Sequence, residues 1–578
     1  MRRRYVISLL IALCALIVVP AARAAAVPPD ADWWSAGIKE ADGTMLHADI
    51  LRPKGLSQTA KTPVILSIGP YFNHSGQVGP AAPAEGVDYN PVGPAGPSDR
   101  FFDFVEGAKL LQRGYTYIMV DLRGFGGSTG CLDWTGPGEQ ADVKAAVEWA
   151  AAQPWSTGKV GMYGKSYDGV TGLIGQVSKP KGLSAVVSQE PVYDLYRYLY
   201  TNGVRYENSL ATPLLYDSIA GTPGTAMDDP SYNQNAVNDF SRPGCPVLNW
   251  ADQQNPDHGS PYWTTRNFIN RAKGATIPLI LTQGFLENNT KPDGAYDYFN
   301  NVAGYKRAWF GMWDHVRGND TDPDTGRLLM GRAGWFDEVM RFYDRFVKGL
   351  SASQAPTDKD PKIAVETSDG TWRAETSWPP SDSKLYTSTL RPGTYVDNGQ
   401  NDGELADANT GLEPTGDGVW TFSKPLPYAA HLSGIPKVTL DVTAQVGNGN
   451  LVADVYDVDA ANNATLISRN AFLLGGARQT VSFPLYGDDW KLGAGHRIGV
   501  LVTSSNADWW AHVPTAQTIT VNGGSISLPF LATARTKTIQ GGPSVRLDYY
   551  KANAPFAVDP ATIAAATSPT FVLPPKQK

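Results

Sequence analysis

Val160-Gly161-Met162-Tyr163-Gly164-Lys165-Ser166-Tyr167-Asp168-Gly169 places a glycine-flanked serine between a short apolar run and a helix-like segment. A serine hydroxyl is a poor nucleophile unless a turn lifts it out of the sheet towards a base, and flanking glycines remove side chains that would crowd such a turn. The pattern predicts a nucleophile elbow with Ser166 as the catalytic residue. The usual spacing is G-x-S-x-G, whereas the second glycine here falls three residues after the serine. An ordinary glycine-rich strand-to-helix turn is therefore the alternative.

The segments around the elbow alternate between strand-like and helix-like patterns. Strand patterns cover residues 46–51, 63–71, 115–120, 183–187, 277–282 and 307–311, and helical patterns cover 101–114, 138–152 and 335–350. This repetition is typical of a mainly parallel sheet with helices on both faces. The predicted fold class of residues 32–350 is therefore α/β, of the α/β-hydrolase kind, with catalytic groups at the carboxyl ends of strands.

The segment 190–273 separates two of these strands and is much longer than ordinary loops. It is rich in Tyr, Asn, Asp and Pro and has a helical stretch at 192–206. We interpret it as an inserted helical cap that covers the site and shapes substrate access. The alternative is a packing insertion with no role in selectivity.

Beyond residue 350 the pattern changes to period two. Apolar residues alternate with polar ones, for example at Val438, Leu440, Val442 and Ala444. Short alternating strands without helices predict an all-β sandwich of jelly-roll type over residues 351–552. The tail, residues 553–578, is predicted to be irregular.

Composition and the N-terminus restrict the class of function. The 578-residue chain has a net charge of −7 and no long basic run, which argues against nucleic-acid binding. Residues 1–26 combine a basic start, an apolar run at 6–19 and a small-residue end. These are features of a cleaved signal peptide, so we expect a secreted protein without stable membrane insertion. An uncleaved membrane anchor is the alternative.

Two cysteines, Cys131 and Cys245, remain after removal of the signal peptide. An even count in an oxidising compartment predicts a disulfide between them, with two free thiols as the alternative. The pair is too small and too widely spaced for a zinc site, and no phosphate loop or cofactor fingerprint stands out. We therefore expect no metal and no cofactor.

A catalytic serine needs a base within hydrogen-bond reach and an acid that orients the base. In open α/β hydrolases the last two stand on loops after later strands, in the order acid, then base. Among the seven histidines, His315 alone follows a late strand of the α/β unit. Glu287 directly follows the preceding strand and is the predicted acid, with Asp293 as the alternative. Asp314 is adjacent to His315, and sequence neighbours rarely aim their side chains at one another.

The oxyanion of the tetrahedral intermediate needs hydrogen-bond donors that are fixed in advance. One predicted donor is the backbone N–H of Tyr167, the residue after the nucleophile. The second should come from the loop after residues 64–68, which reads Pro70-Tyr71. Because this loop lacks a run of glycines that would expose backbone donors, the Tyr71 hydroxyl is the predicted donor instead.

Several motifs occur in order: Pro70-Tyr71, Asp121-Leu122-Arg123-Gly124 with Gly130, the elbow at 164–169, Gly311-Met312-Trp313-Asp314-His315, and Trp372-Arg373 with Trp378-Pro379. Together, over residues 32–551, they resemble the X-Pro dipeptidyl-peptidase and cocaine esterase family of α/β-hydrolase serine enzymes. The resemblance implies a catalytic triad of Ser166, Glu287 and His315, with Tyr71 completing the oxyanion hole. The family usually has aspartate where this chain has Glu287, so the longer side chain needs a slightly retracted loop.

Residues 284–292 and the form of the elbow look most like the peptidase branch of this family. Cleavage after an X-Pro pair requires a carboxylate that holds the substrate ammonium group and an apolar, aromatic pocket for the proline ring. The candidates for that carboxylate are Glu190, Asp194 and Glu207, at the start of the cap. Solvated carboxylates on cap helices are the alternative.

We therefore expect a secreted serine hydrolase that acts through an acyl-enzyme, namely an X-Pro dipeptidyl-peptidase with a peptide substrate. A carboxylic ester or acyl-amide hydrolase of cocaine esterase type is the alternative, because cap residues decide the substrate. An alternative of another class is a surface carbohydrate-binding protein with Trp509 and Trp510 as an exposed stacking platform. The sequence leaves the oligomeric state open.

Overall fold

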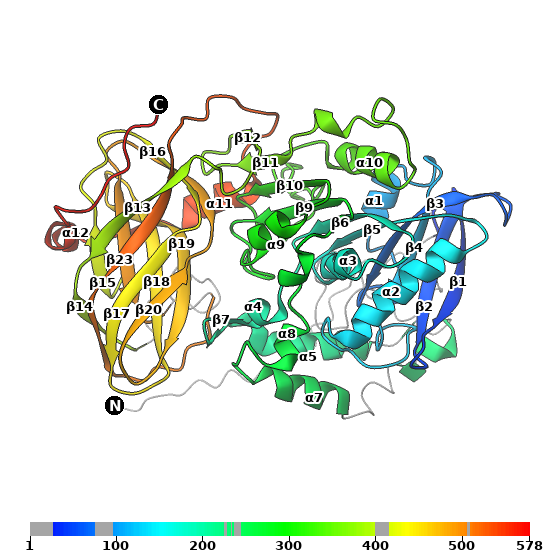
Figure 1. Ribbon diagram of the computed structural model, residues 1–578, viewed down its shortest axis with the longest axis horizontal. Coiled ribbons are helices and arrows are strands. Elements are labelled where there is room, and N and C mark those ends of the chain that lie inside the picture. The colour runs from blue at the N-terminus through cyan, green and yellow to red at the C-terminus, as the bar shows by residue number, and fades with distance from the viewer. Residues whose placement is uncertain are drawn as a thin grey trace.

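The structure, a computed structural model, describes residues 27–74, 96–222, 224, 228–232, 234–235, 244–398, 416–505 and 509–578. An α/β unit and a β-sandwich lie side by side along the long axis of the molecule (Figure 1). The predicted signal peptide, residues 1–26, lies outside the described residues. In the described part of the chain, no helix has the length and apolarity that crossing a membrane requires.

One mixed sheet forms the α/β unit, as the alternating pattern predicted. Its strand order within the described residues is β1-β2-β4-β3-β5-β6-β9-β10-β11-β12. Neighbours from β4 to β11 run parallel, and β1, β2 and β12 add antiparallel edges. Every residue of β3 and β4 is buried, because helices cover both faces. The strands are β1 (Ala31–Lys39), β2 (Met45–Pro53), β3 (Thr62–Gly69), β4 (Thr116–Asp121), β5 (Ser156–Lys165), β6 (Leu183–Gln189), β9 (Leu279–Gly284), β10 (Lys306–Gly311), β11 (Ile363–Glu366) and β12 (Trp372–Glu375).

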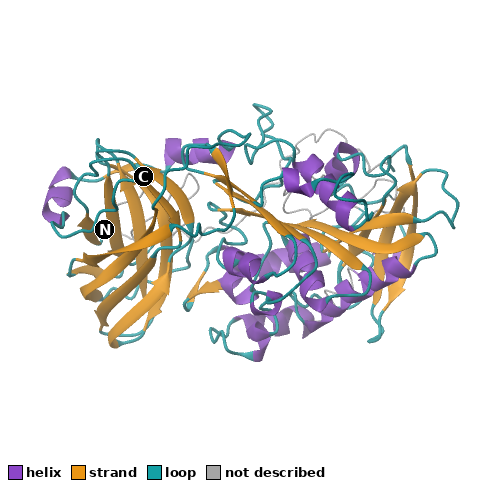
Figure 2. Cartoon of the chain, turned by 45° about the horizontal axis from the view of Figure 1, so that its top comes forward, coloured by secondary structure: helices purple, strands orange, loops and turns teal. Residues whose placement is uncertain are grey.

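Two groups of helices cover the two faces of this sheet (Figure 2). On one face, α2 (Pro137–Ala152) and α3 (Tyr167–Ser178) bury apolar side chains in the larger core. On the other face, α1 (Phe102–Gly107) and α10 (Trp335–Phe346) bury theirs in a separate core. The short helices α9 (Ala295–Asn301) and η3 (Thr357–Lys359) complete the unit. The loops that follow the parallel strands therefore meet at one edge of the sheet.

The segment 190–273 leaves the sheet after β6 and returns at β9, as predicted for an inserted cap. Its helices gather on one side of the sheet (Figure 1). The prediction of a helix over 192–206 is wrong for most of that range, because α4 ends at Leu199 and a two-stranded hairpin follows. The cap elements are α4 (Leu195–Leu199), β7 (Tyr200–Thr201), β8 (Val204–Arg205), α5 (Asn208–Ala220), α7 (Gly244–Gln253), α8 (Pro261–Thr264) and η2 (Asn270–Ala272).

Two antiparallel sheets form the C-terminal sandwich. In its described residues, one sheet has the order β20-β17-β23-β16-β21, with β13 and β14 also pairing with β23, and the other has the order β15-β22-β18-β19-β24. The predicted alternation is confirmed on β17, where Val438, Leu440, Val442 and Ala444 are buried and the residues between them are not. The strands are β13 (Ser383–Leu390), β14 (Gly393–Val396), β15 (Val419–Phe422), β16 (Ala430–Gly434), β17 (Lys437–Ala444), β18 (Gly449–Val458), β19 (Asn463–Leu474), β20 (Ala477–Pro484), β21 (Asp488–Leu492), β22 (Arg497–Thr503), β23 (Thr518–Leu531) and β24 (Phe556–Ala557).

The junction of the two units and the C-terminal tail differ from their predictions. β11 and β12 lie beyond the predicted boundary at residue 351 yet pair with the α/β sheet, and the first sandwich strand begins at Ser383. The helix α11 (Val545–Asn553) follows the sandwich, and the tail predicted as irregular contains α12 (Pro560–Ala566), which packs on Trp420 and its neighbours. A four-residue strand such as β11 and a seven-residue Ala-rich helix are too short to show a period in sequence.

Cys131, in the loop between β4 and α2, is disulfide-bonded. The side chain of Cys245, its predicted partner, lies outside the described residues. The pairing of the two cysteines therefore stays a prediction.

Candidate active site

Ser166 lies at the turn from β5 into α3, where the elbow pattern predicted it. Its backbone has φ 63° and ψ −123°, a conformation that non-glycine residues rarely adopt. Two backbone hydrogen bonds hold the turn: Ser166 N–H donates to the Gln189 carbonyl at 2.9 Å, and Val170 N–H donates to the Ser166 carbonyl at 3.0 Å. The turn thus presents the serine at the carboxyl edge of the sheet.

Close contacts require both glycines of the elbow. A Cβ at Gly164 would lie 2.1 Å from the carbonyl oxygen of Asp168, and a Cβ at Gly169 would lie 2.9 Å from the carbonyl oxygen of Gln189. The second glycine therefore serves the packing of α3 against the end of β6 rather than the turn itself. This contact explains the glycine at position 169.

Glu287 and His315 meet in the loops after β9 and β10. Glu287 Oε2 lies 2.8 Å from His315 Nδ1, and Oε1 accepts from the N–H groups of Asn289 at 2.6 Å and Thr290 at 3.1 Å. Burial favours the neutral acid, but His315 and the Asn289 N–H hold the pKa of Glu287 below its usual value. A carboxylate on Nδ1 favours the tautomer that leaves Nε2 free to accept a proton.

Asp293, the alternative acid, and Asp314, the sequence neighbour of His315, both bind partners other than His315. Asp293 binds Arg197 at 2.8 Å, so the alternative acid points elsewhere. Asp314 lies 3.4 Å from Arg546 Nε, as expected for a sequence neighbour that does not face His315. The geometry therefore selects Glu287 as the partner of the imidazole.

The described residues show no hydrogen bond between Ser166 and His315, but neighbours of the serine contact the loops that bear Glu287 and His315. Thr290 lines the pocket that holds Ser166 and donates its N–H to Glu287. Gln189 accepts the Ser166 N–H on its carbonyl and the Gly318 N–H on its side-chain oxygen at 2.9 Å. The complete triad therefore stays a prediction.

Contacts connect both predicted oxyanion donors to residues of the elbow, and their role stays a prediction. The Arg100 guanidinium stacks on the Tyr71 ring at 3.9 Å and pairs with Asp168, two residues after Ser166. Tyr167 begins α3, and the first N–H groups of a helix have no intrahelical acceptor. A phenol and a backbone N–H thus stand beside the serine turn.

The cap closes over Ser166. The pocket beside the serine measures about 10 Å³, roughly the space of one water molecule, and Tyr198 and Tyr216 from the cap lie in its wall. Tyr216 also hydrogen-bonds the Tyr71 hydroxyl. A larger cavity of about 410 Å³ has His315 in its wall, together with Arg546 and Tyr549 from α11. The sequence missed Tyr216 and Arg546, because nothing in their local patterns indicates which distant loop they contact.

The three carboxylates predicted to hold a substrate amine have different environments. Glu190 is fully buried and accepts four hydrogen bonds from donors at the ends of β9 and β10. Burial and then the Glu287 charge raise the pKa of Glu190 well above its usual value. Asp194 is 1% exposed, caps α4 and binds His258 and Asn267. The prediction is therefore wrong for Glu190 and Asp194, which are structural, whereas Glu207 is exposed at the start of α5.

Trp509 and Trp510 do not form an exposed platform. Each is 2% exposed, and their rings pack with Tyr206 of the cap and Tyr486 of the sandwich. The prediction that they are exposed for carbohydrate stacking is wrong, because two adjacent tryptophans fill the contact between cap and sandwich.

A parallel sheet that presents a serine on a strained strand-to-helix turn, with a carboxylate–histidine pair further along the same edge, is the arrangement of the α/β-hydrolases. A model described as X-Pro dipeptidyl-peptidase (S15 family) matches residues 42–317, and one described as the X-Pro dipeptidyl-peptidase C-terminal non-catalytic domain matches residues 356–545. The chain belongs to the X-Pro dipeptidyl-peptidase and cocaine esterase family of hydrolases, which confirms the resemblance of the motifs.

Relatives in this family carry different activities in their names. A Streptomyces avermitilis protein named as an Xaa-Pro dipeptidyl-peptidase is 25% identical over 447 residues, covering 71% of this chain and 61% of that protein. The cocaine esterase of a Rhodococcus strain is 23% identical over 350 residues, covering 55% of this chain and 59% of that protein. A solved alpha-amino acid ester hydrolase has a TM-score of 0.65 at 18% identity, covering 90% of this chain and 100% of that chain. The chain thus spans about three fifths of the length of both relatives, and the structural likeness concerns the fold.

Proposed function

We propose that this chain is an X-Pro dipeptidyl-peptidase that forms an acyl-enzyme on Ser166. The observation that carries the proposal is the buried Glu287–His315 contact of 2.8 Å on the sheet edge that holds the Ser166 turn. An ionised carboxylate that orients an imidazole keeps Nε2 available as a general base. The family and the elbow support the same chemistry.

In the proposed acylation, His315 Nε2 accepts the Ser166 proton as Oγ attacks the substrate carbonyl carbon. The carbonyl oxygen becomes an oxyanion that the Tyr71 hydroxyl and the Tyr167 N–H stabilise. His315 then donates the proton to the leaving nitrogen, and the C–N bond breaks. In deacylation, His315 takes a proton from water, the water oxygen attacks the ester, and Ser166 leaves with that proton.

Substrate entry in this proposal requires the cap to move. The space of about 10 Å³ beside Ser166 does not admit an acyl group, and Tyr216 engages the hydroxyl that would bind the oxyanion. Displacement of Tyr216 would open the pocket and release Tyr71 in one step. The apolar and aromatic lining left behind suits a proline ring.

The leaving group is proposed to lie in the cavity of about 410 Å³, because His315 stands in its wall and has to protonate the leaving nitrogen. The Arg546 guanidinium stands in the same wall. A cation there suits a leaving peptide that carries a carboxylate.

An ester hydrolase is the second candidate function. Two of the three carboxylates expected to hold the substrate ammonium are buried in structural contacts, and the Rhodococcus relative is named a cocaine esterase. Within the peptidase proposal, the exposed Glu207 takes the ammonium-binding role. The buried carboxylates and the name of the Rhodococcus relative favour an esterase, whereas the family models favour a peptidase. An assay with both kinds of substrate distinguishes the two activities.

Turnover of a Gly-Pro anilide and of a simple aryl ester, measured side by side, tests the proposal. We expect the anilide to be cleaved and Ser166→Ala to abolish both activities. Glu207→Gln should raise KM for the anilide about tenfold or more, because it removes a hydrogen bond to a charged group, and should leave KM for the ester unchanged. Ester turnover alone, abolished by Ser166→Ala, would replace the peptidase proposal by the esterase one.

We also propose that the protein is exported through residues 1–26. Sequencing the N-terminus of protein from the culture medium should give a start after Ala24 or Ala26. Retention of Met1 on protein that stays with the cells would contradict export by cleavage.

A further inference from the structure

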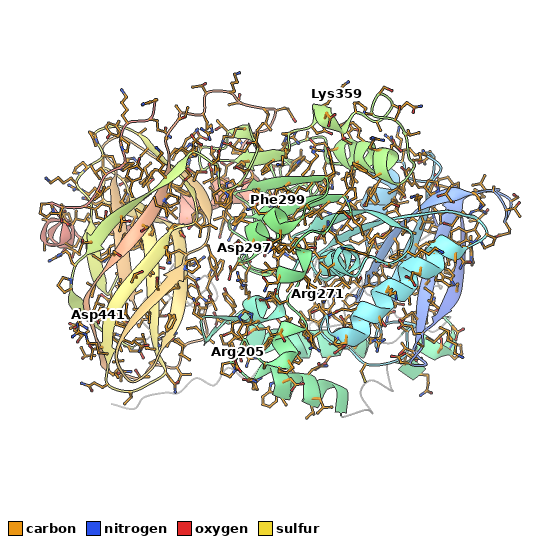
Figure 3. All side chains as sticks on the ribbon, viewed as in Figure 1. Arg205, Arg271, Asp297, Phe299, Lys359 and Asp441 are labelled. Atoms are coloured by element: carbon orange, nitrogen blue, oxygen red, sulfur yellow. The ribbon has the colours of Figure 1, made fainter. Side chains whose placement is uncertain are left out.

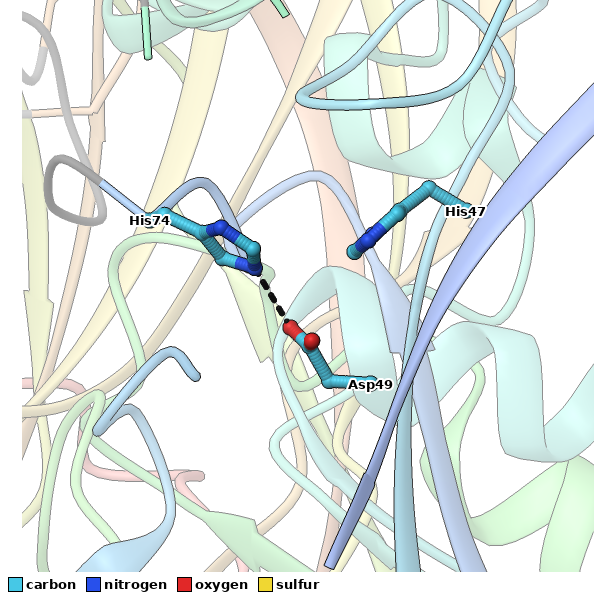
Figure 4. Close-up of side chains that lie close together, drawn as sticks. All are labelled: His47, Asp49 and His74. Carbon is cyan, nitrogen blue, oxygen red and sulfur yellow. Dashed lines mark hydrogen bonds and ion pairs between the residues drawn. The ribbon is translucent and has the colours of Figure 1, made fainter. Parts of the chain in front are cut away.

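A second cluster of ionisable side chains lies outside the proposed catalytic residues. His47 and Asp49 on β2, and His74 in the segment after β3, each offer a ligand atom, and these atoms lie within 4.8 Å of one another (Figure 4). His47 and Asp49 share one face of β2, because residues two apart on a strand point the same way. His74 Nε2 is 2.7 Å from Asp49 Oδ2.

Two further oxygen atoms lie beside these side chains, one next to His47 alone and one between the two histidines. Asp121, at the end of β4, places Oδ2 3.2 Å from His47 Nδ1. The Tyr232 hydroxyl of the cap lies 2.9 Å from His47 Nδ1 and 3.1 Å from His74 Nε2. Asp121 Oδ1 is buried and has no hydrogen-bond partner in the described residues. A buried carboxylate oxygen in that state indicates a missing partner.

Outer contacts fix the inner side chains. His74 Nδ1 lies 2.9 Å from Asp228 Oδ2, so its Nε2 faces the cluster. Asp49 Oδ1 accepts from Trp33 Nε1 at 2.8 Å and from the Ser35 hydroxyl at 3.1 Å, which leaves Oδ2 directed inward. Carboxylates behind ligating histidines, and donors behind ligating carboxylates, are the usual outer shell of a metal site.

The cluster is closed and small. The side chains of His47, His74 and Asp49 are 14%, 2% and 1% exposed. A Cβ at Gly127 would lie 2.7 Å from His47 Cβ, and a Cβ at Gly126 would lie 2.4 Å from the Asp121 carboxylate. The glycine loop therefore presses against the cluster, and the space suits a single ion rather than an organic molecule.

We propose that this cluster is a binding site for a divalent transition-metal ion, with His47, His74 and Asp49 as its ligands and Asp121 beside His47. Two imidazoles and one carboxylate form a donor set that suits Zn²⁺. Asp49, Asp121 and Asp228 are buried carboxylates, and buried negative charges are costly unless a positive charge compensates them. A bound divalent ion would supply that charge. This proposal departs from the sequence-based expectation of no metal, because His74 comes near His47 and Asp49 only through the fold.

The ion would join β2 and β4 to the segment after β3 and, through Asp228 and Tyr232, to the cap. His74 follows Tyr71 by three residues on that segment. The site is therefore structural and would hold in place the loop that bears the proposed oxyanion donor.

Metal analysis of the full-length protein after equilibrium dialysis against Zn²⁺ tests the site. We expect one Zn²⁺ per chain in the wild type and none above background in the double variant His47→Gln, His74→Gln. Chelation should lower the melting temperature of the wild type, and Zn²⁺ should restore it. His496→Gln is the matched control, because His496 also pairs with a carboxylate, Asp457 at 2.7 Å, but in the sandwich.

A conservative variant covers the case in which the double variant does not fold. Asp228→Asn removes only the carboxylate behind His74, and we expect Zn²⁺ affinity to fall about 10- to 100-fold. Absence of Zn²⁺ from the dialysed wild type, or equal uptake by wild type and variants, would overturn the proposal and leave an ion-pair network around a protonated His74. Uptake is measured on Ser166→Ala as well, so its outcome is independent of the proposed catalysis.

Discussion

Ser166 and Glu287 are held in states that an isolated chain would not favour. A non-glycine residue at φ 63° costs on the order of 1–3 kcal/mol, and the Ser166 turn persists because Gln189 and α3 fix it from both sides. Glu287 is fully buried yet ionised, because His315 and two N–H groups compensate its charge. Strain and a buried charge on the same sheet edge fit a site selected for chemistry rather than for stability.

Glu287→Gln should lower kcat for the Gly-Pro anilide by about 10²- to 10⁴-fold, with KM little changed, because a neutral amide no longer holds His315 in the tautomer with Nε2 free. Steady-state kinetics on the purified variant measure this. Asp293→Asn is the control, since Asp293 binds Arg197 instead. A larger loss of kcat in Asp293→Asn than in Glu287→Gln would show that the acid is assigned wrongly.

Glu139, in the first turn of α2, accepts a hydrogen bond from the Tyr167 hydroxyl at 2.7 Å, and burial, then the Asp133 charge, raise its pKa from 4.5 to about 7. Between pH 4.5 and 7 the folded state keeps a proton that the unfolded state has released, so stability falls as pH rises. The loss amounts to about 3 kcal/mol over that window. Glu139→Gln should remove this pH dependence of stability.

Urea unfolding at pH 5 and pH 8 checks this expectation. The wild type should lose stability between the two values relative to Glu139→Gln. Glu148→Gln, a change to the same residue type on the same helix, is the control. A parallel pH dependence of the wild type and Glu139→Gln would contradict the account of Glu139.

At the scale of elements, the cap helix α5 decides access to the serine. Its Tyr216 ring lies 5.3 Å from the Tyr167 ring and 4.9 Å from the Trp134 ring, centre to centre. The Tyr216 hydroxyl meets Tyr71, so one side chain spans the space above the elbow. The ring volume, rather than the hydroxyl, therefore closes the pocket.

A bulky fluorophosphonate probe should label Ser166 about tenfold faster in Tyr216→Ala than in the wild type. In Tyr216→Phe the labelling rate should be close to that of the wild type. The physical reason is that only the first change removes the aromatic ring above Ser166; burying such a ring is worth roughly 1.5–3 kcal/mol. Second-order labelling rates give the comparison. Equal or slower labelling of Tyr216→Ala would contradict the role of the ring as a lid.

The sequence predicted the parts of this site that follow from strand order. Ser166, Glu287 and His315 each stand directly after a long apolar strand, and the carboxyl ends of parallel strands meet at one edge. It did not predict the burial of Glu190, Trp509 and Trp510, because burial of a polar-flanked residue depends on which distant segment covers it. The His47–Asp49 pair carried a usable signal, two ligand types on one strand face, but its partner His74 becomes a neighbour only through the fold.

At the scale of the whole molecule, a buried ion pair joins the two units. Arg373 on β12 of the α/β sheet binds Asp489 on β21 of the sandwich at 2.5 Å, and His431 on β16 lies 2.7 Å from the same carboxylate. Burial favours the neutral acid, but the contacts with Arg373 and His431 hold the pKa of Asp489 far below its usual value. The sandwich also contacts the cap, where Thr201 donates to Asn470 at 2.8 Å. The sandwich thus supports both the sheet and the lid.

Asp489→Asn should destabilise the protein by about 3–5 kcal/mol, because it leaves the Arg373 charge buried without its partner. Calorimetry should show a lower melting temperature, with the two units unfolding in separate transitions. Asp441→Asn is the control: Asp441, labelled in Figure 3, pairs with Arg478 on the exposed side of the sandwich and should matter little. An unchanged single transition in Asp489→Asn would contradict the coupling.

Intact-protein mass spectrometry after reaction with a fluorophosphonate determines whether Ser166 is a nucleophile that His315 activates. We expect one phosphonyl group per chain, located on the peptide that contains Ser166, with labelling at least about 10³-fold slower in His315→Ala. No label on a folded wild-type protein, a label on another residue, or equal labelling of His315→Ala would contradict it.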